Sequence, residues 1–536
     1  MAAQQTAEQT SERTRDAPRG PAWAGAIVGL LTATVGLAVG QLVALPIADP
    51  AAPVVAVGQA VVLLSPEGLK SFAIRTFGSH DKPVLIGGMV LVIIGLAVAL
   101  GMLSMRRRWI GVAGVVGLGV TGAVAAGTRP GAGPLWPVPA LVGMLAALFV
   151  FGRLWSAAQP MRLGDPGAKD DAGERPAPEY GLDRRAFLRA AAIAGAGAVA
   201  AQAVTTVATP HLRAGDISRE TVRLPPPGSP LPPLPAGVDL HVHDLDPFFT
   251  PNDFFYRVDT ALLTPQVASD TWRLRIHGMV DKEVELTFHE LLARPLEEHD
   301  ITLTCVSNPV GGNYVGNARW LGTMLKPLLD EAGVHAGANQ IVSRSSDGMT
   351  IGTPTAAVMD GRDAMLAVGM NGVPLPIAHG FPVRMVVPGL YGYTSATKWV
   401  VDMELTTFAA FDAYWVSEGW AQQATIKTES RIDTPASGTS VRSGTVPVAG
   451  VAWAQHRGIA AVEVRVDGGA WNEARLSTLD TIDTWRQWVW DWGATPGQHT
   501  IEVRATDETG YTQTATRVPP APDGATGWHQ VFVTVT

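Results

Sequence analysis

Residues 302–320 read TLTCVSNPVGGNYVGNARW, and this stretch organises the rest of the chain. It contains Cys305, the only cysteine among 536 residues. Ile301–Val306 is apolar and β-branched, which predicts a buried strand, and a glycine-rich turn ending in Asn-Ala-Arg-Trp follows it. A lone thiol at the end of a strand can be a soft metal ligand or a nucleophile, but a single cysteine is more often a small buried hydrophobe. The residues alone leave these roles open.

Composition narrows the class of protein. A chain of 536 residues is too long for one domain, so three or more units are expected. The formal net charge of −8 provides no general basic surface, so nucleic acid is not a predicted partner. A single cysteine excludes intrachain disulfides, iron–sulfur clusters and c-type haem.

Residues 1–160 predict a four-helix transmembrane region. Each of four uncharged apolar runs is long enough, at ~20 residues, for a helix to cross a bilayer. None of them contains a histidine or an acidic residue, so the bundle is interpreted mainly as an anchor, with a quinone pocket left open. A shorter apolar stretch, Val54–Leu64, is expected to lie in the membrane interface or to re-enter. The four runs are Trp23–Leu45, Val84–Met105, Trp109–Gly127 and Leu135–Gly152.

Arginine clusters predict the orientation of these helices. If the runs cross alternately, all the clusters fall on one side, which the positive-inside rule makes cytoplasmic. Residues 161–210 are predicted to be a cytoplasmic linker and a fifth membrane segment, in which Asp183–Arg189 (DRRAFLR) resembles a twin-arginine export signal. An ordinary fifth transmembrane helix is the alternative. Either way, everything after about Pro210 is expected outside the cytoplasm, on a multi-pass protein of the cell (inner) membrane. The clusters are Arg13, Arg15 and Arg19; Arg106, Arg107 and Arg108; and Arg153 and Arg162.

A proline-rich linker over 211–240 is expected to lead into an α+β domain over 241–424. Predicted strands are Trp272–Ile276 and Val284–Phe288, and predicted helices are His289–Ala293 and Gly322–Ala332. Two further blocks follow the cysteine strand, MNGVPLPIAHGFPVR at 370–384 and PGLYGYTSATKW at 388–399. Their basic side chains, spaced by turns and strands, can converge on an anionic ligand. These side chains are His379, Arg384 and Lys398.

These blocks, in this order over residues 252–407, resemble the sulfite oxidase family of molybdenum enzymes. The resemblance implies a molybdenum–molybdopterin cofactor (Moco) with Cys305 as its metal ligand and as a catalytic residue. It also implies Arg257 at an oxo-anion site and a catalytic tyrosine, for which Tyr391 or Tyr393 is the candidate. The residues that it implies for cofactor binding are Asn308, Arg319, His379, Arg384, Thr397 and Lys398.

The chain departs from the family pattern in two places. Sulfite-oxidising members have arginines after the asparagine of the cysteine strand, whereas here Asn308 is followed by Pro309 and Val310. The active-site tyrosine of the family would fall at Met349. A neutral or different oxo-acceptor, such as a sulfoxide, therefore stands beside sulfite as a candidate substrate.

Residues 425–536 alternate between apolar and polar over short runs, which predicts an immunoglobulin-like β-sandwich without a disulfide. The segment from Gly450 to Leu476 also resembles the dimerisation domain of the same family, which implies a possible homodimer. The predicted strands are Thr445–Ala452, Ala461–Val466, Trp485–Trp490, His499–Ala505 and Gln530–Val535.

The sequence thus predicts a multi-domain protein: a transmembrane bundle, an α+β molybdopterin-binding domain and an immunoglobulin-like sandwich. The predicted function is oxygen-atom transfer to or from a small sulfur or other oxo substrate. The electrons would pass through a separate electron carrier or quinone. Two alternatives stay open, a membrane-tethered binding module built on a degenerate scaffold and a hydrolase with Cys305 as nucleophile.

Overall fold

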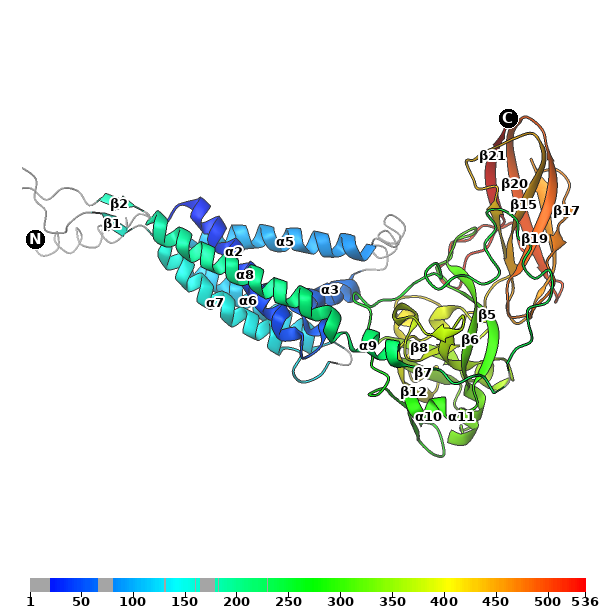
Figure 1. Cartoon of the computed structure of the whole chain (residues 1–536), viewed down its shortest axis with the longest axis horizontal. Coiled ribbons are helices and arrows are strands. Elements are labelled where there is room, and N and C mark those ends of the chain that lie inside the picture. Colours follow the sequence, from blue (N-terminus) through cyan, green and yellow to red (C-terminus); the bar gives the residue numbers. More distant parts are fainter. Residues whose placement is uncertain are drawn as a thin grey trace, which may run out of the picture. The chain divides into compact units, whose positions relative to one another are not determined.

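The computed structural model describes residues 20–65, 81–129, 132–159, 161–163, 179–181, 183–228 and 230–536. These residues form two compact units (Figure 1). One contains the described residues up to Leu212 together with Ala261–Leu263. The other contains Arg213–Thr260 and Thr264–Thr536. Each unit is described here by itself.

The first unit is helical and contains five described helices long and apolar enough to cross a membrane. Four of these helices coincide with the four predicted apolar runs, and the other lies in the predicted fifth segment. Val54–Leu64, expected in the interface, falls in the short apolar helix α3 (Pro53–Leu64). Arg13, Arg15 and Arg19 lie outside the described residues. The five helices are α2 (Ala22–Ala44), α5 (Asp81–Ser104), α6 (Arg108–Gly127), α7 (Val138–Ala157) and α8 (Arg184–Leu212).

Glycines allow helices α2 and α5 to pack closely. A Cβ added at Gly29 would lie 1.9 Å from the carbonyl oxygen of Ala97, and one at Gly101 would lie 2.1 Å from that of Gly25. In membranes, small residues let backbones approach in this way and van der Waals contacts then hold the helices together. Before α8, where a linker was predicted, two short strands pair antiparallel, β1 (Met161–Leu163) and β2 (Glu179–Gly181).

The second unit begins with an α+β domain built on two sheets. The first sheet has the strand order β10-β9-β6-β5, with β11 also paired to β9, and the second has the order β4-β3-β12-β7-β8. The strands of the first sheet are β5 (Glu297–Thr304), β6 (Val315–Met324), β9 (Met365–Met370), β10 (Val373–Pro374) and β11 (Arg384–Val386). Those of the second are β3 (Arg273–Gly278), β4 (Val284–Thr287), β7 (Gln340–Ser345), β8 (Thr350–Pro354) and β12 (Val400–Thr406).

Short helices connect these strands. Helix α10 begins with a capping box, in which the Thr287 side chain accepts from the Glu290 amide and the Glu290 side chain accepts from the Thr287 amide. The helices are α9 (Ala214–Thr221), α10 (Phe288–Leu292), α11 (Leu325–Ala332), α12 (Thr355–Met359) and α13 (Tyr414–Ser417), with single 3₁₀ turns η1 (Asp49–Ala51, in the helical unit), η3 (Ile377–His379) and η4 (Gly392–Thr394).

The stretch quoted at the outset forms a β-hairpin. Strands β5 and β6 pair antiparallel from Glu297↔Gly322 to Thr304↔Val315, and Cys305 comes directly after the last pair. Asn-Ala-Arg-Trp, predicted to end a turn, lies within β6. The predicted helix Gly322–Ala332 is present as α11 but begins only at Leu325, because β6 continues to Met324. Gly322 allows β6 to approach the neighbouring strand β9 closely, because a Cβ there would lie 2.3 Å from the carbonyl oxygen of Leu366.

The C-terminal part is the predicted β-sandwich (Figure 1, orange to red). One sheet has the order β13-β15-β19-β18 and the other β14-β21-β20-β16-β17. Apolar side chains of both sheets share one core, which includes Val448, Trp488 and Val503. The strands are β13 (Glu429–Thr434), β14 (Ser440–Val441), β15 (Gly444–Trp453), β16 (Ile459–Val466), β17 (Asn472–Glu473), β18 (Arg475–Leu476), β19 (Arg486–Ala494), β20 (Gly497–Asp507) and β21 (His529–Val535).

Candidate active site

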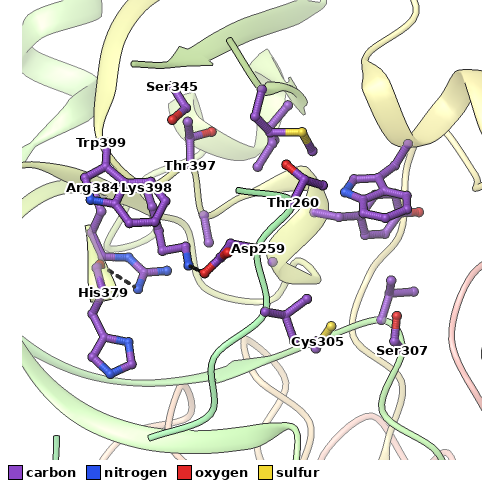
Figure 2. Close-up of a pocket in the computed structure, with 18 of the residues that line it drawn as sticks. Asp259, Thr260, Cys305, Ser307, Ser345, His379, Arg384, Thr397, Lys398 and Trp399 are labelled. Carbon is purple, nitrogen blue, oxygen red and sulfur yellow. Dashed lines mark hydrogen bonds and ion pairs between the residues drawn. The ribbon is translucent and has the colours of Figure 1, made fainter. Parts of the chain in front are cut away.

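A cleft that is partly open to solvent lies in the second unit. Figure 2 shows Cys305 and Ser307 on one side, the basic residues His379, Arg384 and Lys398 on the other, and Asp259 between them. The cleft therefore joins the cysteine block to both downstream blocks of the sequence.

Cys305 is buried at the end of the hairpin. Its amide donates to the carbonyl of Tyr314 at 2.9 Å, and its carbonyl accepts from the Asn308 amide at 3.0 Å, so the backbone on both sides of the thiol is fixed. Burial raises the pKa of the thiol, while hydrogen bonds from Ser307 and the charge of Lys398 act in the opposite direction. A soft metal would replace the thiol proton, because the thiolate is the ligand form of cysteine.

Arg384 lies across the cleft with its charge uncompensated. Its side chain is 5% exposed, its Nη1 donates to the carbonyl of His379 at 3.2 Å, and its guanidinium lies 5.0 Å from the centre of the Trp320 ring. Its Nε has no hydrogen-bond partner among the described residues. Burial lowers the pKa of Arg384 to about 10. A buried cation with an unused donor favours an anionic ligand.

Lys398 and His379 complete the basic side. The ammonium of Lys398 contacts Asp259 Oδ2 at 2.9 Å and the carbonyl of Ala378 at 3.3 Å, and burial lowers its pKa to about 8 although Asp259 opposes this. His379 donates from Nε2 to the carbonyl of Asn252 at 3.0 Å. Burial and the charge of Arg384 lower the pKa of His379 to about 4, so the ring is neutral at pH 7. The cleft thus combines two cations with one neutral imidazole.

Thr397 also lines the cleft, where its hydroxyl and that of Ser343 lie 2.6 Å apart. Met349, the position at which the family tyrosine would fall, lines the cleft as well. Another part of the wall is aromatic: Tyr393 lies 5.9 Å from Trp420, and Trp420 lies 6.3 Å from Trp415, between ring centres.

Two residues of the cleft were missed by sequence reasoning. Tyr256 lines it and stacks on Phe255, with ring centres 5.3 Å apart. Burial and the neighbouring Cys305 raise the pKa of Tyr256, while Arg384 opposes them. Asp259 is the partner of Lys398. Both flank Arg257, so the signal was their place beside a predicted site residue.

Arg257 itself is not among the residues lining the cleft. Its Nε pairs with Asp259 Oδ2 at 2.8 Å, its Nη2 donates to Thr264 Oγ1 at 2.8 Å, and its side chain is 40% exposed. Tyr391 is also outside the lining and is fully buried against the sandwich, where its hydroxyl accepts from the Lys427 amide at 3.4 Å. Their predicted catalytic roles stay predictions.

Arg319 and Asn308 lie beside the cleft and not in its wall. Arg319 forms a bidentate ion pair with Asp300 at 2.8 and 2.7 Å. Asn308 accepts from the Tyr314 amide at 2.9 Å and so ties the loop after Cys305, while its Nδ2 is buried without a partner in the described structure. Both residues therefore make contacts that hold the hairpin and its loop.

The comparisons with known proteins agree with this site. Residues 261–415 match the oxidoreductase molybdopterin binding domain, and residues 429–503 match a bacterial Ig domain. The mitochondrial sulfite oxidase of Rattus norvegicus is 29% identical over 285 residues, which cover 45% of this chain and 52% of that protein. The chain therefore spans about half the length of that relative.

The uncharacterized oxidoreductase YuiH of Bacillus subtilis is 30% identical over 149 residues, which cover 28% of this chain and 72% of that protein. Among solved structures, the sulfane dehydrogenase SoxCD from Paracoccus pantotrophus matches with a TM-score of 0.48 and 24% identity, over 55% of this chain and 82% of that one.

The residues present fit the implied molybdenum cofactor. A single buried thiol offers a soft ligand on one side of the cleft, and an unpaired guanidinium offers donors for a phosphate on the other. The cofactor match, the relatives and the arrangement of these blocks agree. The chain belongs to the sulfite oxidase family of molybdenum-dependent oxidoreductases.

Proposed function

We propose that this protein is a membrane-anchored oxidoreductase that transfers an oxygen atom to or from a small sulfur or other oxo substrate. The observation that carries the proposal is the cleft itself, which sets the buried thiol of Cys305 opposite the buried guanidinium of Arg384, whose Nε has no partner among the described residues. A scaffold without activity has no need of a buried charge that lacks a partner, because such a charge costs stability.

In this proposal Cys305 binds the metal through its thiolate. Arg384 and Lys398 bind the phosphate of the pterin, and neutral His379 and Thr397 fix its orientation by hydrogen bonds. The bound molybdenum supplies two-electron oxygen-atom transfer. Asp259 holds Lys398 in place, at 2.9 Å between Nζ and Oδ2. Tyr256 faces both Cys305 and Arg384, which supports a role for its hydroxyl as a hydrogen-bond donor to substrate oxygen.

The balanced reaction sets what else is required. In the oxidative direction, substrate and water give oxidised substrate, two protons and two electrons. In the reductive direction, an oxo substrate, two protons and two electrons give the reduced substrate and water. The electrons would be exchanged with a separate electron carrier or a quinone.

The wall of the cleft supports a neutral oxo substrate over the sulfite anion. Pro309 and Val310 follow Asn308 and supply no charge. The charge of Arg257 is already paired with Asp259. Part of the cleft wall is aromatic, through Tyr393, Trp415 and Trp420. An aromatic surface accommodates an organic sulfoxide or thioether at a lower desolvation cost than a small anion.

The placement of the active site is part of the proposal. Arg106 and Arg107 connect the C-terminal end of α5 to the N-terminal end of α6, Arg153 lies near the C-terminal end of α7, and Arg184 and Arg185 begin α8. Alternate crossing then puts these ends in the cytoplasm and the residues after Leu212 outside. The sandwich is inferred to pair two copies, which the mass of the solubilised protein would test.

Metal analysis tests the function. The purified protein should contain about one molybdenum and one pterin per chain, by elemental analysis and by fluorescence of the released pterin. Cys305→Ala should remove the thiolate-to-metal absorption band and lower turnover with an artificial redox dye by ~100-fold or more. A protein without molybdenum whose activity is unchanged in Cys305→Ala would contradict the proposal.

A further inference from the structure

Strand β5, which leads to Cys305, is the outermost strand of its sheet. An edge strand exposes unpaired backbone groups, which proteins cover or pair. Here the segment 481–485 of the sandwich runs along that edge. The Thr302 amide donates to the carbonyl of Asp483 at 3.0 Å, and the Trp485 amide donates to Thr302 Oγ1 at 2.7 Å. The sandwich thereby covers part of the outer edge of β5.

Gln455 contacts β5 one residue before the thiol. It is fully buried, and its Nε2 donates to the carbonyl of Thr302 at 3.0 Å and to Thr304 Oγ1 at 3.1 Å. Thr304 is the residue directly before Cys305. The Oε1 of Gln455 has no partner among the described residues. In the described structure this buried amide thus donates only to residues of β5, which belongs to the neighbouring domain.

The sandwich also contacts the loop on the other side of Cys305. Arg431 Nη1 donates to the carbonyl of Gly312 at 3.1 Å, and the Arg431 guanidinium is itself held by Asp433 and Asp246. A Cβ on Gly311 would lie 2.1 Å from the ring of His529. The backbone is therefore held by the sandwich both before and after the thiol.

We propose that the sandwich positions the Cys305 thiolate for the metal, and that Gln455 is the positioning residue through which it acts. This rests on the proposed function, in which Cys305 binds molybdenum. Residues that orient a metal ligand without touching the metal commonly change metal affinity or activity by about 10–100-fold. The orientation of the sulfur depends on the backbone that leads to Cys305, and Gln455 ties β5 to the sandwich through the Thr302 carbonyl and the Thr304 hydroxyl.

The test compares two buried glutamines of the sandwich in the full-length, cofactor-loaded protein. Gln513 is the matched control: it is buried, its Nε2 donates to the carbonyl of Gly527, and its Oε1 accepts from Ser430 and from the Ala505 amide, all within the sandwich. Gln455→Ala should shift the thiolate-to-metal absorption band and the paramagnetic resonance of the half-reduced metal, and should lower molybdenum content by ~10-fold. Gln513→Ala should lower the melting temperature and leave the spectra unchanged.

A second variant covers the case in which Gln455→Ala fails to fold. Thr304→Val keeps the shape of the side chain and removes only the hydroxyl that accepts from Gln455. It should shift the same spectra in the same direction by a smaller amount. Where Gln455→Ala folds, the double variant that carries both changes should show the same spectral shift as Gln455→Ala alone. The reason is that Gln455→Ala already removes the hydrogen bond that Thr304→Val removes.

The outcomes separate this inference from the proposed function. If Gln455→Ala folds and its spectra equal those of the wild type, the positioning role is overturned. If Gln455→Ala does not fold, wild-type spectra in Thr304→Val overturn it instead. Equal spectral shifts in Gln455→Ala and Gln513→Ala would also overturn it. Molybdenum in the wild type, with its thiolate band lost in Cys305→Ala, would still uphold the proposed function.

Discussion

Arg384 holds a positive charge that is almost completely buried. The side chain is 5% exposed and its Nε has no partner among the described residues. An uncompensated buried charge costs several kcal/mol, on the order of 3–5 when a partner is missing. A bound phosphate would offset that cost through charge-assisted hydrogen bonds. The same side chain therefore destabilises the cofactor-free protein and stabilises the loaded one.

This leads to a prediction with opposite signs in the two states. Arg384→Met should raise the melting temperature of protein made without cofactor, and should lower the cofactor retained by loaded protein by ~10-fold or more. Calorimetry and fluorescence of released pterin measure the two effects.

Arg319→Met is the control for this prediction. It strands the buried Asp300 carboxylate and should cost about 3–5 kcal/mol in both states, with retention per folded molecule unchanged. A loss of retention in Arg319→Met equal to that in Arg384→Met would instead restore Arg319 as a cofactor ligand.

At the residue scale, the sequence motifs predicted part of the site. Cys305, His379, Arg384, Thr397 and Lys398 all line one cleft, as the order of the blocks indicates. Partners across the fold were beyond a linear motif. Arg319 and Asp300 are direct cross-strand neighbours, so the hairpin register, once known, would have predicted their ion pair.

At the scale of elements, alternation predicted the sandwich strands β15, β16, β19, β20 and β21, and it is clearest in β20 and β21, where buried residues alternate with more exposed ones. Strand β13 was not predicted, and neither were the short edge strands β14, β17 and β18, since two residues show no period. Strand β20 ends at Asp507, which joins two parts of the sandwich. Its carboxylate accepts from Thr428 Oγ1 at 2.7 Å and from Arg457 Nε at 3.0 Å.

Asp507 should make the fold sensitive to acid. Burial alone would raise its pKa, but hydrogen bonds from Thr509, Thr428, Arg457 and the Tyr511 amide outweigh burial and lower the pKa to about 2. A carboxyl near ~3.9 when unfolded then contributes about 2–3 kcal/mol above that pH, and the contribution is lost as the pH falls from about 4 to about 2.

Asp507→Asn should therefore lower the melting temperature at pH 6 and flatten its decline between pH 4 and pH 2.5, as measured by calorimetry of the solubilised protein. Asp491, which is on the exposed part of β19, provides the control, since Asp491→Asn should leave both unchanged. A steep decline retained in Asp507→Asn would rule out this carboxyl as the source.

At the scale of the whole molecule, the apolar helices were the most predictable feature, because about 20 uncharged residues leave few other structures. The class of the catalytic domain followed from its ordered blocks. The packing of the sandwich against the cysteine hairpin did not, because hydrogen bonds such as Thr302 to Asp483 join residues far apart in the chain.

The route of export can be tested at this scale. If Arg184 and Arg185 form a twin-arginine signal, changing both to lysine should abolish export of the catalytic unit, while α2 to α7 still insert. Protease accessibility in spheroplasts measures this, and Arg189→Lys is the matched control. Normal export of the double variant would identify α8 as an ordinary transmembrane helix.

The hydrogen bond between the Thr302 amide and Asp483 also dictates a schedule for biogenesis. When Cys305 emerges from the ribosome, the nascent chain still lacks the sandwich residues that hydrogen-bond to β5. At ~5–20 residues per second, the missing partners emerge many seconds later. The edge of β5 therefore stays uncovered until the sandwich has been synthesised. A chain truncated before Gln455 would keep the residues that line the cleft but would lack the hydrogen bonds that hold β5 to the sandwich.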